Sequence, residues 1–237
     1  MKALIFDCDG VLVDTERDGH RVAFNRAFAA MGLGVEWDIP TYGRLLRIAG
    51  GKERMTAYFD SREWPAGVSD RAAFIQELHR RKTDLFMQIV EGGELPLRSG
   101  VARVIDEAIS DGVALAVCST SNERAVSLIV DHMLGPERRA RFSAILAGDI
   151  VPKKKPAPAI YDLAKKRLAL PGSECLVVED SRNGLLSAIA AGCHCVVTTS
   201  VYTSAEDFAG AEAVYSELGD PPGAHVTLAE LRRMAER

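Results

Sequence analysis

The sequence of 237 residues has no apolar run long enough to cross a membrane and no excess of basic residues. A membrane-spanning helix needs roughly 20 consecutive apolar residues, and the formal net charge of −4 offers no basic face for nucleic acid. The first apolar segment begins near residue 2, which leaves no room for a targeting peptide. We therefore expect a soluble, cytoplasmic protein with neither membrane nor nucleic acid as a partner. No pattern reports the oligomeric state, and a monomer is compatible with the sequence.

Cysteine is scarce and irregularly placed. The five cysteines are an odd number and include no C-x-x-C pair, and they stand at Cys8, Cys118, Cys175, Cys193 and Cys195. Most of them lie in or beside apolar segments with the character of strands. Reduced thiols in a buried core are therefore expected, rather than a disulfide framework or a zinc site.

Short apolar segments alternate with helical periodicity along most of the chain. Strands are predicted at residues 3–6, 113–118, 144–146, 175–178, 194–198 and 213–215. Helices are predicted between them at 101–111, 122–134, 158–168 and 183–191. Near-continuous apolar strands separated by helices predict an α/β protein with a doubly wound, Rossmann-like parallel sheet.

The segment that follows the first strand departs from this alternation. It shows helical periodicity at 21–31, 42–48, 54–59 and 72–90 and no convincing strand. Gly92, Gly93 and Pro96 interrupt the pattern at its end. We expect a helical cap domain at residues 17–95, inserted into a catalytic core made of residues 1–16 and 96–237.

Two carboxylates directly follow the first strand. Alternation along an extended chain places Asp7 and Asp9 on one side, and Gly10 permits a sharp turn after them. A calcium loop would also begin D-x-D-G, but Val11-Leu12-Val13 supply none of the further oxygen ligands such a loop needs. A solvated turn is the remaining structural alternative. The favoured interpretation is a catalytic pair, in which one carboxylate attacks and its neighbour transfers a proton.

Polar residues also follow the other predicted core strands. Because ligands bind at the carboxyl ends of the strands in such a sheet, these residues are expected to meet. They are Ser119, Thr120 and Ser121 after the second strand, the lysines 153–155 after the third, and Glu179 and Asp180 after the fourth. Of the lysines, Lys155 is favoured because the following proline restricts its backbone.

This combination of residues predicts phosphoryl transfer. Carboxylates of Asp7, Glu179 and Asp180 are suitable ligands for Mg²⁺, which screens the attack of one anion on another. Ser119 is expected to hold phosphoryl oxygens, and Lys155 to neutralise charge on the phosphoryl group and on Asp7. Each also has a structural interpretation: a serine often caps a turn, and acids often precede a helix.

Four strings make the chain similar to the haloacid dehalogenase superfamily. These are DCDGVLVDTE, VCSTSN, KKKPAP and VVEDS, and they resemble the motifs of its capped phosphatase and phosphomutase members. The strings GGKERMTAYF, LHRRKTDLF, LGPERRARF and AGDIVPKKKPAPAIY resemble the CbbY-like branch. The resemblance runs along the whole length.

The resemblance implies a Mg²⁺-dependent phosphatase acting on a phosphorylated sugar, particularly xylulose-1,5-bisphosphate. It implies that Asp7 forms an aspartyl-phosphate and that Asp9 is the general acid and then the base. The implied metal ligands are the side chains of Asp7 and Asp180 and the backbone carbonyl of Asp9, with Glu179 in the outer shell.

Substrate selection is expected to depend mainly on the cap, since the core meets only the phosphate. A sugar bisphosphate has a second phosphate that requires cations, and Lys52 and Lys82 match the branch pattern. The candidate substrate-binding residues are Glu16, His20, Gly51, Lys52, Lys82, Thr120, Ser121 and Asn122.

Three other functions compete with a phosphatase. A sugar phosphomutase of the β-phosphoglucomutase type shares every core motif and differs in the fate of the phosphoenzyme. A carbon–halogen hydrolase needs no acid two residues after the nucleophile, so Asp9 argues against it. A non-enzymatic sensor is expected to have lost at least one motif, and all four are present.

Overall fold

The computed structural model describes residues 1–48 and 50–236, and the chain divides into two compact units. The first unit comprises Met1–Asp14 and Leu95–Arg237. The second comprises Thr15–Glu94. Among the described residues, no helix combines the length and apolar character that a membrane span requires.

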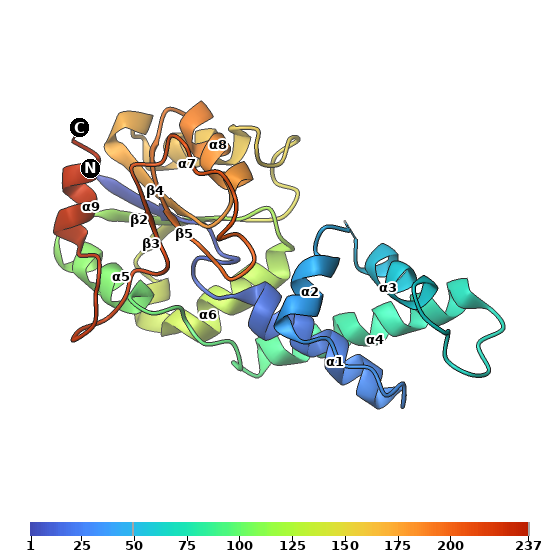
Figure 1. Ribbon diagram of the computed structural model, residues 1–237. Coiled ribbons are helices and arrows are strands. Elements are labelled where there is room, and N and C mark those ends of the chain that lie inside the picture. The colour runs from blue at the N-terminus through green and yellow to red at the C-terminus, as the bar shows by residue number, and fades with distance from the viewer. Residues whose placement is uncertain (49, 237) are drawn as a thin grey trace. The chain divides into compact units, whose positions relative to one another are not determined.

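A parallel sheet of six strands forms the centre of the first unit (Figure 1). Its strands are β1 (Ala3–Phe6), β2 (Ala114–Cys118), β3 (Phe142–Leu146), β4 (Cys175–Glu179), β5 (His194–Thr198) and β6 (Ala213–Tyr215). Their spatial order is β3-β2-β1-β4-β5-β6, so the chain winds outward from β1 in both directions. The predicted doubly wound sheet is therefore confirmed, and β1 and β4 are neighbours.

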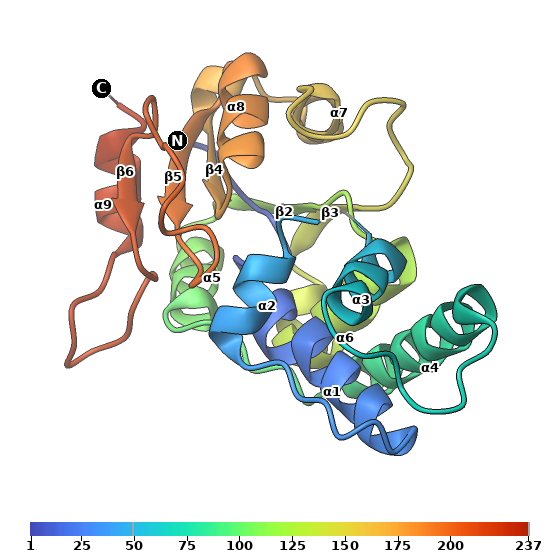
Figure 2. The ribbon, with the colours of Figure 1, turned by 45° about the vertical axis from the view of Figure 1, so that its right-hand side comes forward.

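Helices cover both faces of this sheet (Figure 2). On one face lie α5 (Val101–Ser110) and α6 (Glu123–Arg139), and on the other α7 (Ala159–Leu168) and α8 (Arg182–Ala190). A 3₁₀ turn, η2 (Gly172–Glu174), precedes β4, and α9 (Leu228–Met234) packs against α5. The central strands are buried on both sides, as their near-continuous apolar sequences require.

Two helices of this unit differ from the sequence expectation. Helix α6 was expected to end near residue 134, but helical structure resumes after Gly135, whose φ of 74° and ψ of 165° kink the chain before Pro136. Proline is tolerated there because it stands at the first turn of the resumed helix. Helix α9 was not predicted; it is short and depends on a capping box between Thr227 and Glu230.

The second unit consists of helices joined by turns and loops, and none of its described residues forms a strand. It contains the π-helical turn η1 (Thr15–His20), α1 (Arg21–Ala30), α2 (Ile39–Leu45), α3 (Gly51–Asp60) and α4 (Arg71–Glu91). Trp37 is fully buried, and its ring centroid lies 4.8 Å from those of both Phe24 and Phe28. Contacts of this kind between aromatic rings stabilise the unit. The predicted helical insertion after the first strand is confirmed.

Arg98 joins three loops at the carboxyl end of the sheet. Its guanidinium donates to the backbone carbonyl of Gly10, to those of Thr198 at 3.1 Å and Thr199 at 2.7 Å, and to that of Ser216 at 2.6 Å. The planar guanidinium has enough donors to serve several carbonyls together. It therefore connects the turn after β1 to the ends of β5 and β6.

Replacing Arg98 by methionine is expected to lower the free energy of unfolding by about 2–4 kcal/mol, because several carbonyls lose a charged donor at once. Urea unfolding of the whole chain measures the change. Arg233→Met is the control: Arg233 is 70% exposed and its nearest carboxylate oxygen is 3.9 Å away. Equal, small effects of both substitutions would contradict the role assigned to Arg98.

Candidate active site

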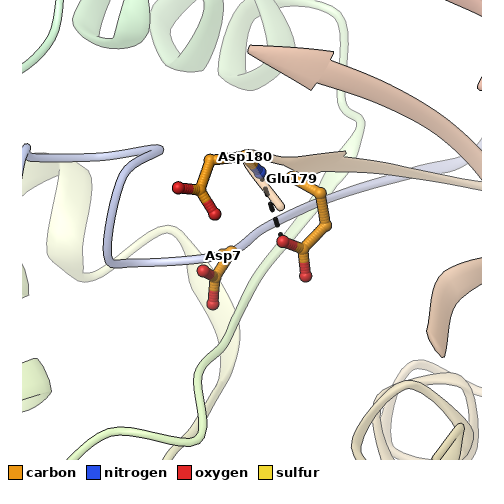
Figure 3. A group of neighbouring side chains, drawn as sticks. All are labelled: Asp7, Glu179 and Asp180. Carbon is orange, nitrogen blue, oxygen red and sulfur yellow. Dashed lines mark hydrogen bonds between the residues drawn. The ribbon is translucent and has the colours of Figure 1, made fainter. Parts of the chain in front are cut away.

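The acidic residues predicted from sequence meet at the carboxyl ends of β1 and β4. Strand β1 ends at Phe6 and continues into Asp7, while β4 ends at Glu179 and is followed by Asp180. The pairing of Phe6 with Val178 places the two strand ends side by side. Figure 3 shows the side chains of Asp7, Glu179 and Asp180 gathered there. Carboxylate oxygens of the three residues lie within 4.8 Å of one another.

Lys155 provides the cation of this cluster. Its Nζ donates to Oδ1 of Asp7 at 2.8 Å, to Oε1 of Glu179 at 2.7 Å and to the backbone carbonyl of Cys118 at 3.0 Å. An ammonium has three N–H donors, so all three are used. The side chains of Lys155 and Glu179 are buried. The three hydrogen bonds hold the ammonium in one place.

The surroundings of Glu179 leave its carboxylate little freedom. The hydroxyl of Tyr161 donates to the same Oε1 that accepts from Lys155, and the backbone N–H of Asp180 donates to Oε2 at 3.2 Å. A Cβ at Gly184, in the first turn of α8, would overlap this carboxylate. Glu179 thus fits only because the first turn of the helix that follows contains a glycine at this position.

Asp9 is held by two hydroxyls from the loop after β2. Its Oδ2 accepts from Oγ of Ser121 at 2.5 Å and from Oγ of Ser119 at 3.1 Å. Gly10 follows with a φ of +76°, which favours glycine, and a Cβ there would overlap the Asp180 carboxylate. The turn after β1 therefore allows Asp9 to face the second strand's loop and Asp180 to lie close to the backbone.

Burial and like charges shift the titration of the carboxyl groups. Burial raises the pKa of Asp7 to about 7, while Lys155 acts against the rise and Glu179 and Asp9 add to it. The pKa of Asp180 is raised well above its ordinary value by burial and then by Glu179 and Asp7. Four carboxylates surround one ammonium, so negative charge is in excess.

The basic and phenolic partners remain protonated. Burial acts to lower the pKa of Lys155, but the charges of Asp7 and Glu179 outweigh it and raise the pKa. Burial, followed by the charge of Glu179, raises the pKa of Tyr161 well above its ordinary value. Tyr161 is therefore the hydrogen-bond donor to Glu179, and Lys155 is a cation at neutral pH.

The cluster fits a small divalent cation. Its donors are hard carboxylate oxygens, which suit Mg²⁺, and its excess negative charge favours a cation. One oxygen of Glu179 already accepts from Lys155 and Tyr161. Asp7 and Asp180 are consequently the residues better disposed to bind an ion directly.

The remaining predicted residues of the first unit lie in the loop after β2. The carbonyl of Thr120 accepts from Nζ of Lys154 at 3.1 Å, and Lys154 also pairs with Asp149 at 3.0 Å. The side-chain oxygen of Asn122 accepts from the backbone N–H of Ala125 at 3.2 Å and caps α6. Asn122 thus has a structural role as a helix cap.

Within the helical unit, the predicted residues form two groups. His20 Nδ1 lies 2.9 Å from Nζ of Lys82, which also lies 4.8 Å from the ring centroid of Phe24. Separately, Oε2 of Glu16 accepts from the hydroxyl of Tyr42 at 2.6 Å. That hydroxyl in turn accepts from Arg54 at 3.1 Å.

Gly51 and Lys52 begin helix α3. A Cβ at Gly51 would lie 2.9 Å from Nε2 of His79, so this helix approaches α4 closely at that point. Lys52 is exposed. Burial lowers the pKa of His79, and the charges of Lys82 and Lys52 lower it further.

Lys82 is a buried cation in this unit. Burial lowers its pKa to about 8, against the charge of Glu16, which raises it. Burial, then Lys82, lowers the pKa of His20 well below its ordinary value, so the ring is neutral and Nδ1 accepts from the ammonium. Among the described residues, His20 is the one hydrogen-bond partner of the Lys82 ammonium. An ammonium has three N–H donors, so this bond uses one of them.

Sequence reasoning missed Tyr161. This residue lies in α7, whose inner face packs on β2 and β3. A tyrosine on the apolar face of a helix is normally predicted to be a core residue. Its position in the sequence does not indicate a contact with Glu179. A weak signal existed, because a buried phenol requires a hydrogen-bond partner and an acid ends the strand predicted next.

The sequence pattern of the haloacid dehalogenase-like hydrolases matches residues 1–192. The chain therefore belongs to the haloacid dehalogenase-like hydrolase family. Among its relatives, the CBBY-like protein of Arabidopsis thaliana is 56% identical over 231 residues, which are 96% of this chain and 72% of that protein. Protein CbbY of Cupriavidus necator is 43% identical over 223 residues, 93% of this chain and 87% of that protein.

Two crystal structures of CbbY from Rhodobacter sphaeroides share the fold at 38% identity. One is a complex with phosphate, at a TM-score of 0.74, and the other is a mutant in complex with xylulose-(1,5)bisphosphate, at 0.73. Each alignment covers 98% of this chain and 99% of the other chain. The chain thus falls in the CbbY-like branch, as its motifs predicted, and is a phosphatase of sugar phosphates.

Gly184→Ala is expected to reduce phosphatase activity about tenfold or more, because the added Cβ displaces the Glu179 carboxylate and misplaces its partners. Helix propensity alone would favour alanine by roughly 1 kcal/mol. Steady-state kinetics on an aryl phosphate measures the loss. Gly223→Ala is the control, since its Cβ meets only the carbonyl of Asp220, at 3.3 Å. Full activity in Gly184→Ala would show that Glu179 tolerates displacement.

Proposed function

We propose that this protein is a Mg²⁺-dependent phosphatase that hydrolyses a sugar bisphosphate, such as xylulose-1,5-bisphosphate, through an aspartyl-phosphate. The observation that carries the proposal is the 2.8 Å contact between Asp7 Oδ1 and the buried Lys155 ammonium, with Asp9 two residues further on. It is supported by the xylulose bisphosphate bound to CbbY of Rhodobacter sphaeroides, a protein 38% identical to this chain.

In the first half-reaction, a carboxylate oxygen of Asp7 attacks phosphorus and the sugar oxygen leaves. Asp9 donates a proton to that oxygen, so the sugar departs as an alcohol. The Lys155 ammonium, already on Asp7, offsets the charge of the attacking carboxylate. As Asp7 becomes an acyl phosphate it loses its negative charge, and Lys155 can then transfer that hydrogen bond to a phosphoryl oxygen.

In the second half-reaction, water attacks the acyl phosphate. Asp9, now a carboxylate, accepts a proton from the water as the bond between phosphorus and the Asp7 oxygen breaks, which regenerates the Asp7 carboxylate and releases inorganic phosphate. The hydroxyls of Ser119 and Ser121 both donate to Oδ2 of Asp9 and so orient this carboxyl group for proton transfer. Mg²⁺ bound by Asp7, the Asp9 carbonyl and Asp180 would neutralise charge on the phosphoryl oxygens.

The second phosphate of the substrate is assigned to cations of the helical unit. Lys82 is buried, pairs with a neutral histidine and retains donors for an anion. Lys52 is exposed at the start of α3 and near His79. We propose these two lysines as phosphate ligands, with Glu16, His20 and Gly51 beside them as further substrate contacts. In the first unit, Thr120, Ser121 and Asn122 are proposed substrate contacts.

The test is phosphate release from a panel of phosphorylated sugars with Mg²⁺, with matched bisphosphate and monophosphate pairs. We expect the highest kcat/KM for a bisphosphate, loss of activity with a chelator, and recovery on adding Mg²⁺. Asp7→Asn is expected to retain less than about 1% of activity, because an amide does not attack phosphorus. Conversion of glucose 1-phosphate to its 6-phosphate, without release of phosphate, would instead indicate a phosphomutase.

The Lys82 assignment predicts a pH dependence of binding. The lysine is protonated below its pKa of about 8, so KM for a bisphosphate should be flat there and rise at higher pH. Lys82→Met should raise KM for the bisphosphate about tenfold at pH 7 and abolish the dependence. KM for a small aryl phosphate should hardly change. A bisphosphate KM unaltered by the substitution would remove Lys82 from the site.

The lowered pKa of Lys82 also predicts a change in stability with pH. The folded state has a lowered pKa, so the unfolded chain binds the proton more readily between about 8 and the ordinary value of 10.5. Stability should therefore rise with pH in this window, and Lys82→Met should remove the rise. At pH 7 the variant should be more stable than the wild type, because it buries no charge. Urea unfolding at a series of pH values measures both effects.

A further inference from the structure

Tyr161 touches two members of the catalytic cluster from outside it. This tyrosine is fully buried in α7, six positions after Lys155. Its hydroxyl donates to Oε1 of Glu179, and its ring lies under the Lys155 ammonium, with Nζ 5.1 Å from the ring centroid. One side chain therefore contacts both an acid and the lysine that bonds to it.

The Lys155 ammonium depends on three acceptors for its position. One is the backbone carbonyl of Cys118, the last residue of β2, and another is Oδ1 on the short side chain of Asp7, directly after β1. The third, Oε1 of Glu179, stands at the end of a flexible side chain. The place of this oxygen decides whether Lys155 can reach Asp7 and Glu179 at once.

Three groups limit the rotation of the Glu179 carboxylate. The Asp180 N–H bonds Oε2, Gly184 closes the side toward α8, and Tyr161 bonds Oε1 from α7. Without the phenol, Oε1 would keep only the Lys155 ammonium, which is itself the group to be placed. The Tyr161 hydroxyl therefore fixes the position of Oε1 independently of Lys155.

We propose that Tyr161 is a positioning residue, which holds Oε1 of Glu179 where it receives Lys155 and so keeps the ammonium on Asp7. The inference rests on the proposed roles of Asp7 and Lys155. Tyr161 acts through Glu179 and does not contact the substrate, so its effect should vanish when Glu179 no longer carries the charge that Lys155 needs.

The experiment is a double-mutant cycle with Tyr161→Phe and Glu179→Gln in the full chain. Phenylalanine keeps the ring beneath Lys155 and removes only the hydroxyl. We expect Tyr161→Phe to lower kcat on an aryl phosphate about tenfold or more, with KM changed less than about threefold. In the Glu179→Gln background, the same substitution should change kcat less than about threefold.

A second measurement does not depend on turnover. The Kd of inorganic phosphate, measured by calorimetry with Mg²⁺ present, should rise about threefold or more in Tyr161→Phe and show the same loss of effect in Glu179→Gln. Tyr215→Phe is the matched control, since its hydroxyl faces Sδ of Met234 at 3.9 Å in the same unit. We expect it to leave kcat and Kd at wild-type values.

Activity of Tyr161→Phe within about twofold of the wild type would overturn the proposal. So would an equal loss with and without the Glu179 charge, which would mean that the hydroxyl serves packing alone. A wild-type chain that releases no phosphate from any ester would refute the proposed function instead. The phosphate-binding cycle would still decide the role of Tyr161.

Discussion

The whole active-site arrangement depends on one buried ammonium placed between two carboxylates. Lys155 lies within 2.8 Å of Asp7 and 2.7 Å of Glu179, and a backbone carbonyl takes its third N–H. Removing the ammonium would leave both carboxylates without their cation, which costs about 3–5 kcal/mol. Burial therefore forces these groups to be present together. The acids that remain in excess of the lysine make the cluster suitable for a divalent cation and for phosphate chemistry.

The acidic cluster depends on places where the backbone lies very close to a carboxylate. Gly10 permits the turn after β1 and leaves room for Asp180, and Gly184 leaves room for Glu179. Arg98, in the segment between the helical unit and α5, donates a hydrogen bond to the Gly10 carbonyl. Tyr161 completes the support from α7. Residues that surround the acidic cluster thus help to determine where its carboxylates lie.

The buried lysine of the helical unit has no carboxylate bonded to it among the described residues, unlike Lys155. Lys82 is buried beside Phe24 and a neutral histidine, and the pKa of its ammonium is lowered to about 8. The burial of this charge costs stability. In the first unit, by contrast, carboxylates raise the pKa of Lys155. Carboxylates therefore stabilise the charged form of Lys155, whereas burial disfavours the charged form of Lys82.

The sequence by itself determined the parallel sheet, the helical insertion and the identity of the acids and lysine at the strand ends. Periodicity and strand-end position report these features directly, because they are local properties of the chain. Only the tertiary structure decided that Ser119 and Ser121 bond Asp9, that Asn122 caps a helix, and that Tyr161 holds Glu179. Helix α9 and the resumption of α6 after Gly135 were also missed. Such contacts join residues far apart in sequence, or depend on a rotamer, and no periodic pattern encodes them.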